Sequence, residues 1–284
     1  MEKTINLCLR ATRMELWNGI RSVKFWLTIG GFVILMMLDT LPTLYAGSSI
    51  AQDGTRIFST DIISMSLNVT NGASFLFWLR FCLYVIPYGC CFYEEYSQQA
   101  VKYRIGRCSC ISYGISRIVT CILLTGLSVW LAEMIYTLTM FFQGVKLILP
   151  QQSDADPNYY LYQLIAEGHY IGFWFLLTFF KCFAGIFFST MTLVLSTFIK
   201  NKYVLVAMPL VVFFSLDSFS GLWFHNGLTQ PDWINWRVLF FSMLDGGVMT
   251  EAAAVLRTAI YTAVTVTLFS IIFIGRVRQA VENE

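Results

Sequence analysis

Six long apolar runs, separated by stretches that are richer in polar and charged residues, dominate the pattern of the chain. Each run contains few charges and is long enough for a helix to cross a hydrocarbon core about 30 Å thick, which takes about 20 residues. A membrane β-barrel would instead show shorter segments that alternate between apolar and polar residues. We therefore predict an all-α polytopic membrane protein with six transmembrane helices, at about 25–45, 73–93, 113–142, 170–199, 203–224 and 253–275.

The composition agrees with this pattern. Hydrophobic residues occupy 57% of the 284 positions and charged residues only 13%, whereas soluble domains contain about 25% charged residues. Six spans leave too few residues for a large soluble domain beside them. We expect residues 1–284 to form a single transmembrane domain.

Basic residues are distributed unevenly among the connections. Lys and Arg residues close to span ends stay preferentially on the cytoplasmic side of a membrane. Three connections contain one basic residue each, namely Arg56, Lys146 and Arg237. The other segments and the span ends beside them contain thirteen: Lys3, Arg10, Arg13, Arg21, Lys24, Lys102, Arg104, Arg107, Arg117, Lys200, Lys202, Arg276 and Arg278. We predict a multi-pass protein of the cell membrane with both termini in the cytoplasm.

The sequence contains no recognisable catalytic or metal-binding constellation. It lacks the phosphate loop GxxxxGK[ST] and the motifs GxGxxG, HExxH and GxSxG. Its eight cysteines do not have the spacing of a zinc site, and His169 and His225 are predicted on the opposite side of the membrane from them. We expect no catalytic residue, no metal and no cofactor in this chain. An intramembrane enzyme built from scattered carboxylates and serines stays open as an alternative.

The N-terminal segment, residues 1–24, has the pattern of an amphipathic helix. Basic residues alternate there with Leu16, Ile20 and Val23 at three- to four-residue spacing. Such a helix lies in the membrane interface, with its basic side chains near the headgroups. We expect an elbow helix before the first span. The alternative is a basic tail that only sets the topology.

The connection between the fifth and sixth spans is rich in tryptophan. It reads GLWFHNGLTQPDWINWRVLFFSMLDGGV and contains Trp223, Trp233 and Trp236 near polar residues. Tryptophan is enriched at the membrane interface because its ring is apolar and its N–H is polar. We expect short re-entrant helices in the outer leaflet. An aromatic anchor without a ligand role is the alternative.

Six charged residues fall within the spans or at their edges. Each would cost about 2.5–3.5 kcal/mol at the centre of a membrane, so placement against lipid without a partner is unfavourable. Three acidic and three basic residues balance each other: Asp39, Arg80, Glu133, Lys181, Asp217 and Arg257. Arg80 and Glu133 fall at similar depth, which allows pairing between spans two and three. These residues form either structural ion pairs or the polar lining of a pathway.

A charged, helix-compatible strip, residues 92–119, separates two of the most apolar runs. It begins with Glu94 and Glu95 and continues with the basic residues Lys102, Arg104, Arg107 and Arg117. This layout resembles the permeases of type-2 ABC exporters. In that family an acidic residue ends the second span, a Gly-Thr pair follows about four residues later, and a basic residue opens the third span. Gln99 and Ala100 stand here in place of that pair, and CSCIS replaces a proline-containing turn.

The resemblance covers the layout of nearly the whole chain and about 25 residues of motif. It implies that the strip is a cytoplasmic coupling helix whose charged residues contact a separate ATPase. It also implies a complex of two permeases, more favourably a homodimer, with two cytosolic ATPase subunits that bind ATP and Mg²⁺. Membrane lipid is expected among the partners, and nucleic acid is not.

The function expected from this resemblance is export of amphipathic peptide or lipid-like cargo, driven by the ATPase partner. Antimicrobial peptide export or immunity is common among small permeases of this kind. A permease for drugs or polysaccharides is the near alternative. A secondary transporter or channel that works without ATP, with Arg80, Glu133 and Lys181 along its pathway, is the alternative from another class.

Overall fold

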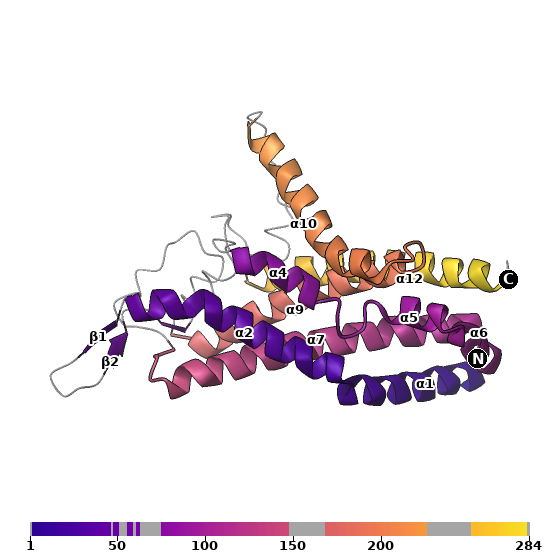
Figure 1. The fold of residues 1–284 in the computed structure, drawn as a ribbon, viewed down its shortest axis with the longest axis horizontal. Helices are drawn as coiled ribbons and strands as arrows, with labels where there is room; N and C mark the ends of the chain where they lie inside the picture. Colours follow the sequence, from indigo (N-terminus) through magenta and orange to yellow (C-terminus); the bar gives the residue numbers. More distant parts are fainter. Residues whose placement is uncertain are drawn as a thin grey trace.

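The computed structural model describes residues 2–46, 48–50, 56–58, 61–62, 75–147, 168–225 and 251–282. In chain order its elements are α1 (Glu2–Arg21), α2 (Val23–Ala46), β1 (Ser48–Ile50), β2 (Arg56–Phe58), α4 (Phe75–Leu83), α5 (Cys91–Ser97), α6 (Ala100–Arg107), α7 (Cys110–Phe142), α9 (Tyr170–Leu195), α10 (Lys202–His225) and α12 (Glu251–Glu282). Both chain ends, α5 and α6 lie together at one end of the molecule, which we call the terminal end (Figure 1). Strands β1 and β2 lie at the opposite end (Figure 1).

Long apolar helices form most of the described structure. Within the described ranges, four are long and apolar enough to cross a membrane: Val23–Pro42 of α2, Cys110–Phe142, Tyr170–Leu195 and Val255–Ala280 of α12. They coincide with the first, third, fourth and sixth predicted spans. The mostly helical character expected from the sequence is therefore confirmed, and four helices of this length and composition indicate a membrane-embedded protein. The antiparallel pair β1 and β2, with Ser48 opposite Phe58, is a short exception to the predicted all-α class.

The second predicted span is not one continuous helix. Helix α4 ends at Leu83, and residues 84–90 form a series of turns before α5 begins. Pro87 lies in this segment and has no backbone N–H to donate. Just before this proline, the N–H of Ile86 donates to the carbonyl of Leu83, three residues earlier. Bonds across three residues are those of the tighter 3₁₀ turn rather than of the α-helix. The apolar pattern predicted the run but did not register the break that this proline introduces.

The fifth predicted span coincides with α10, and within the described residues its apolar part includes Lys202–Leu216. Figure 1 shows α10 leaning away from the other helices. Helix α10 touches α4 and α9, and Phe213 packs against Phe81 with ring centroids 4.0 Å apart. The re-entrant helices predicted between the fifth and sixth spans fall mainly on residues 226–250, which lie outside the described residues.

Helix α1 forms where the amphipathic N-terminal helix is expected. It ends at Arg21, and the hydroxyl of Ser22 donates a hydrogen bond of 2.7 Å to the carbonyl of Gly19. An elbow helix would turn sharply away from the first span, whereas α1 continues roughly in the direction of α2 (Figure 1) and packs against α7. The interfacial placement of α1 stays a prediction.

Helix α7 occupies the centre of the bundle, in contact with α1, α2, α9 and α12. It can be surrounded in this way because apolar residues lie on all its sides and small polar residues permit close packing. Ser189 of α9, for example, lies 3.0 Å from Thr125 of α7. Gly19 makes the approach of α1 possible, since a Cβ atom there would lie 2.2 Å from a methyl group of Leu124.

Candidate functional site

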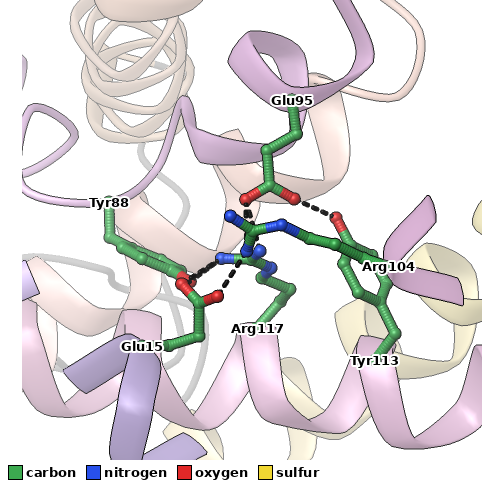
Figure 2. A network of polar contacts seen from close by, with 6 residues as sticks. All are labelled: Glu15, Tyr88, Glu95, Arg104, Tyr113 and Arg117. Carbon is green, nitrogen blue, oxygen red and sulfur yellow. Dashed lines mark hydrogen bonds and ion pairs between the residues drawn. The ribbon is translucent and has the colours of Figure 1, made fainter. Parts of the chain in front are cut away.

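Arg117 forms the centre of a buried polar network at the terminal end (Figure 2). Its side chain is only 2% exposed. Nη1 donates a hydrogen bond of 2.7 Å to Glu15 and a second to the hydroxyl of Tyr88, while Nη2 donates to Glu95. The guanidinium carbon lies 5.6 Å and 5.1 Å from the ring centroids of Tyr88 and Tyr113. One cation is thus held by two carboxylates and two aromatic rings.

These members of the network come from four separate parts of the chain. Glu15 belongs to α1, Tyr88 to the turns after α4, and Glu95 to α5. Tyr113 and Arg117 stand four residues apart on α7 and therefore share one face of that helix. The hydroxyl of Tyr113 donates a hydrogen bond of 2.7 Å to Glu95.

Arg104 connects helix α6 to the same carboxylates. Its Nη1 pairs with Glu15 and lies 3.0 Å from Glu95. Two arginines and two carboxylates therefore balance, which is the condition under which buried charges are tolerated. Burial raises the pKa of Glu95, while the positive charge of Arg117 opposes this rise by favouring the carboxylate.

The start of α7 is fixed by an N-cap at Ser109. The side chain of Ser109 accepts a hydrogen bond of 3.2 Å from the backbone N–H of Ser112. Serine is among the strongest N-cap residues because its oxygen satisfies one of the free N–H groups of the first turn. The cap defines where the helix begins, and so where Arg117 points.

Glu94 joins a second, separate set of cations. Its carboxylate bridges Lys24, near the start of α2, and Lys202, at the start of α10, where the N–O distance is 2.6 Å. Burial alone would raise the pKa of Glu94, but the hydrogen bonds from Lys202 and Lys24 outweigh it and lower this pKa overall. The same hydrogen bond raises the pKa of Lys202. Glu94 thus connects α5 to the starts of α2 and α10.

The residues predicted for ATPase coupling are therefore divided by the structure. Glu95 and Arg117 are buried and pair with each other, and their contact with an ATPase stays a prediction. Arg104 is half-exposed and joins them, whereas Glu94 belongs to the second set. Lys102 and Arg107 lie on α6, but their side chains are outside the described part of the structure.

Three network members were missed by sequence reasoning: Glu15, Tyr88 and Tyr113. Glu15 is separated from Arg117 by 102 positions, so no local pattern relates them. A usable signal was the position of Glu15 four residues before Gly19. That spacing puts the carboxylate on the helix face that permits close approach.

The predicted intramembrane charges form a second group, at the level of the spans. Lys181 of α9 pairs with Glu133 of α7 at 2.6 Å, and both side chains are 5% exposed. Arg80 of α4 lies 3.6 Å from Asp39 of α2 and also interacts electrostatically with Glu133. Glu133 thus pairs with Lys181 of α9 and also interacts with Arg80, the partner that the sequence allowed, while Arg80 is shared between Glu133 and Asp39.

The two remaining intramembrane charges are less defined. Arg257 is half-buried on α12. The side chain of Asp217, on α10, lies outside the described residues.

Comparison with known proteins gives no relative for this chain. No family model matches it, and neither a curated protein nor a solved structure shows significant similarity to it.

Proposed function

We propose that the chain is the permease subunit of an ATP-driven exporter of the type-2 ABC kind. In this proposal two copies, each with six spans, an elbow helix and outer re-entrant helices, assemble with two cytosolic ATPase subunits. The ATPases bind ATP and Mg²⁺, and the permease itself is not an enzyme. The terminal end faces the cytosol, in line with the uneven distribution of basic residues.

The observation that carries the proposal is that α6 is a short helix connected by a charged network to the long helices behind it. Tyr103 on α6 is 78% exposed, while Arg104, the next residue, reaches Glu15 on α1 and Glu95 on α5. A partner that engages the outer face of α6 therefore acts on residues tied directly to Arg117 of α7. Such a layout suits a coupling helix, whose movement must reach the spans.

The network gives this movement a route. Displacement of α6 carries Arg104 with it, and the shared carboxylates Glu15 and Glu95 transfer the displacement to Arg117 and hence to α7. Energy enters as a difference in contact between the two states of the ATPase. Because Arg117 is buried and multiply bonded, it resists independent motion and transmits displacement well.

The position of Gln99 agrees with the coupling-helix register that the resemblance implies. Gln99 stands between α5 and α6, where the family has a glycine, and its backbone has a φ of 56°. Glycine adopts such a left-handed conformation without the penalty that a side chain incurs. The chain therefore makes the glycine-type turn with a glutamine.

The cargo is proposed to be an amphipathic peptide or lipid-like molecule, with drugs and polysaccharides as rivals. This step rests on the resemblance of the layout, because a fold does not determine a substrate. The long apolar helices that face outward suit contact with lipid and with a second copy of the chain.

The proposal is tested by purifying the tagged chain from its native membrane and identifying the associated subunits by mass spectrometry. We expect an ATPase with a phosphate-loop motif. Tyr103→Glu should reduce the amount of ATPase recovered, because it places a charge on the outer face of α6. Tyr203→Glu is the matched control, since Tyr203 is an equally accessible tyrosine, 87% exposed, at the start of α10. Recovery of no ATPase, or equal loss with both variants, would contradict the proposal.

A secondary transporter is the second candidate, and the buried charges of the spans favour it. Four charged residues from four helices, Asp39, Arg80, Glu133 and Lys181, are buried near one another at the level of the membrane. Ionisable residues in that position are commonly functional. Transport by the purified chain in proteoliposomes without any ATPase, abolished by Glu133→Gln, would establish this candidate instead.

A further inference from the structure

A pocket of about 320 Å³ opens at the terminal end, between α5, the residues that follow α9, and α12. Its volume falls at the lower end of the roughly 300–1,000 Å³ typical of small-molecule sites. The described residues that line it are Phe92, Tyr93, Tyr96, Ser196, Thr197, Lys200, Arg276, Gln279 and Ala280. The pocket is separate from the Arg117 network and from the intramembrane charges.

The pocket carries positive charge without a compensating carboxylate. Lys200 and Arg276 both line it, and its described lining residues include no Asp or Glu. Neither cation forms an ion pair within the part of the chain that the structure describes. By contrast Arg278, two residues beyond Arg276, pairs with Glu282 at 2.7 Å. The two pocket cations are thus available to an anionic ligand.

Uncharged groups hold these cations in place. The Nζ of Lys200 lies 5.9 Å from the ring centroid of Tyr96. The guanidinium of Arg276 lies 4.3 Å from the ring centroid of Phe198 and donates a hydrogen bond of 3.0 Å to Gln279. Aromatic rings and an amide orient a cation while leaving its charge uncompensated. Arg276 can therefore bind a phosphate through two parallel N–H groups, and Lys200 can bind it as a point charge.

The hydroxyl groups of the pocket add a second requirement on the ligand. Ser196 donates its proton to the carbonyl of Leu193 at 2.6 Å, and Thr197 donates to that of Val194 at 2.8 Å. Their oxygens therefore remain as acceptors and favour a ligand that brings hydroxyl donors of its own. Phe92 adds an apolar part to the wall. The ligand that fits these groups best is a phosphate ester of an alcohol that carries further hydroxyl groups.

We propose that this pocket binds a phosphoglycerol group, with Lys200 and Arg276 on the phosphate and the Ser196 and Thr197 oxygens accepting from the glycerol. A phospholipid of the phosphatidylglycerol class brings this group to the ends of the spans, where the pocket opens. Free glycerol phosphate carries the same chemistry from solution. The inference does not depend on the transport function proposed above.

The test uses the full-length chain in nanodiscs of phosphatidylcholine alone, or of equal parts phosphatidylcholine and phosphatidylglycerol, with thermal unfolding followed by tryptophan fluorescence. A ligand that binds only the native state raises the melting temperature. We expect phosphatidylglycerol to raise the melting temperature of the native chain. It should raise that of the control variant Arg278→Gln equally, because this variant removes a neighbouring cation that lies outside the pocket. The combined variant Lys200→Gln and Arg276→Gln should lose this response, and each single variant should bind about tenfold more weakly.

A second arm separates the two sources of the ligand. Glycerol 1-phosphate added to phosphatidylcholine nanodiscs should give no stabilisation if the lipid is the ligand; stabilisation that is absent from the combined variant would identify the soluble form instead. Inorganic phosphate serves as the probe for the charge alone. Because Lys200 is exposed, its single variant is expected to fold even if the combined one does not. Equal stabilisation of the native chain and Lys200→Gln by phosphatidylglycerol, or no stabilisation of the native chain by either phosphatidylglycerol or glycerol 1-phosphate, would overturn the proposal.

Discussion

Replacement of Arg117 by methionine tests whether the buried network holds the terminal end together. The variant keeps a long, apolar side chain but removes the cation that Glu15 and Glu95 share. Breaking a buried ion pair by removing one partner typically costs about 3–5 kcal/mol, because the remaining charge is buried without compensation. We expect a value near the lower end, since Arg104 still reaches both carboxylates.

The loss of the aromatic contacts adds to this cost. Two tyrosine rings face the guanidinium of Arg117, and a cation over an aromatic face contributes about 0.5–2 kcal/mol. A loss of roughly 3–5 kcal/mol is a large part of the free energy of unfolding of a typical protein, which is roughly 5–15 kcal/mol. Unfolding in mixed micelles, followed by tryptophan fluorescence against denaturant, measures the difference.

A compensating variant distinguishes an electrostatic network from simple packing. If the stranded carboxylates cause the loss, then Glu15→Gln and Glu95→Gln added to Arg117→Met should recover much of it, because no buried charge remains. Arg278→Gln is the control, since it removes an arginine from an exposed pair and should change little. The reasoning is refuted if Arg117→Met is no more destabilising than this control, or if neutralising the carboxylates makes the protein weaker still.

Four further predictions concern other parts of the structure. Gly19→Leu should destabilise by about 1–3 kcal/mol through overpacking against α7, while Gly30→Leu, with open space around its Cβ, should be tolerated; chemical unfolding compares them. Glu94 has a lowered pKa in the folded chain, so its stabilisation is present above the unfolded value near 4.5 and is lost as the pH falls through the folded pKa; Glu94→Gln should remove that dependence, and an unchanged acid profile would contradict it. Gln99→Gly should stabilise by roughly 1 kcal/mol, measured by thermal unfolding, because the left-handed backbone suits glycine; a lower melting temperature would argue against strain there. Lys181→Met should cost about 3–5 kcal/mol by stranding its buried carboxylate partner, which unfolding in micelles would show; a neutral effect would mean that the pair is not a stabilising contact.

The sequence predicted the long helices well because their signal is local. The apolar runs at 113–142 and 170–199 correspond closely to α7 and α9, since membrane thickness sets both the length and the composition of such helices. The break after Leu83 was missed, because an apolar run looks the same whether it is one helix or a helix followed by turns. Pro87, followed by Gly89, was a local cue to it.

The candidate site was predicted in part. Glu95 and Arg117 were identified from their places at the span ends, and the structure brings them together. The sequence did not reveal that Glu95 is buried, because burial depends on which helix packs there, and a pattern within one segment does not contain that information. Glu15 enters the site for the same reason: the packing of α1 on α7 is a tertiary choice.

Adjacent residues on an α-helix point about 100° apart, and α5 uses this angle to send two neighbouring carboxylates to different cations. Glu94 goes to the lysines at the starts of α2 and α10, and Glu95 to the arginines of α6 and α7. Removing one residue from the turns at 84–90 would change where α5 begins, and so the directions in which both carboxylates face. The number of residues in that turn segment is therefore constrained more tightly than their identity, so that deletions there should be far more damaging than substitutions.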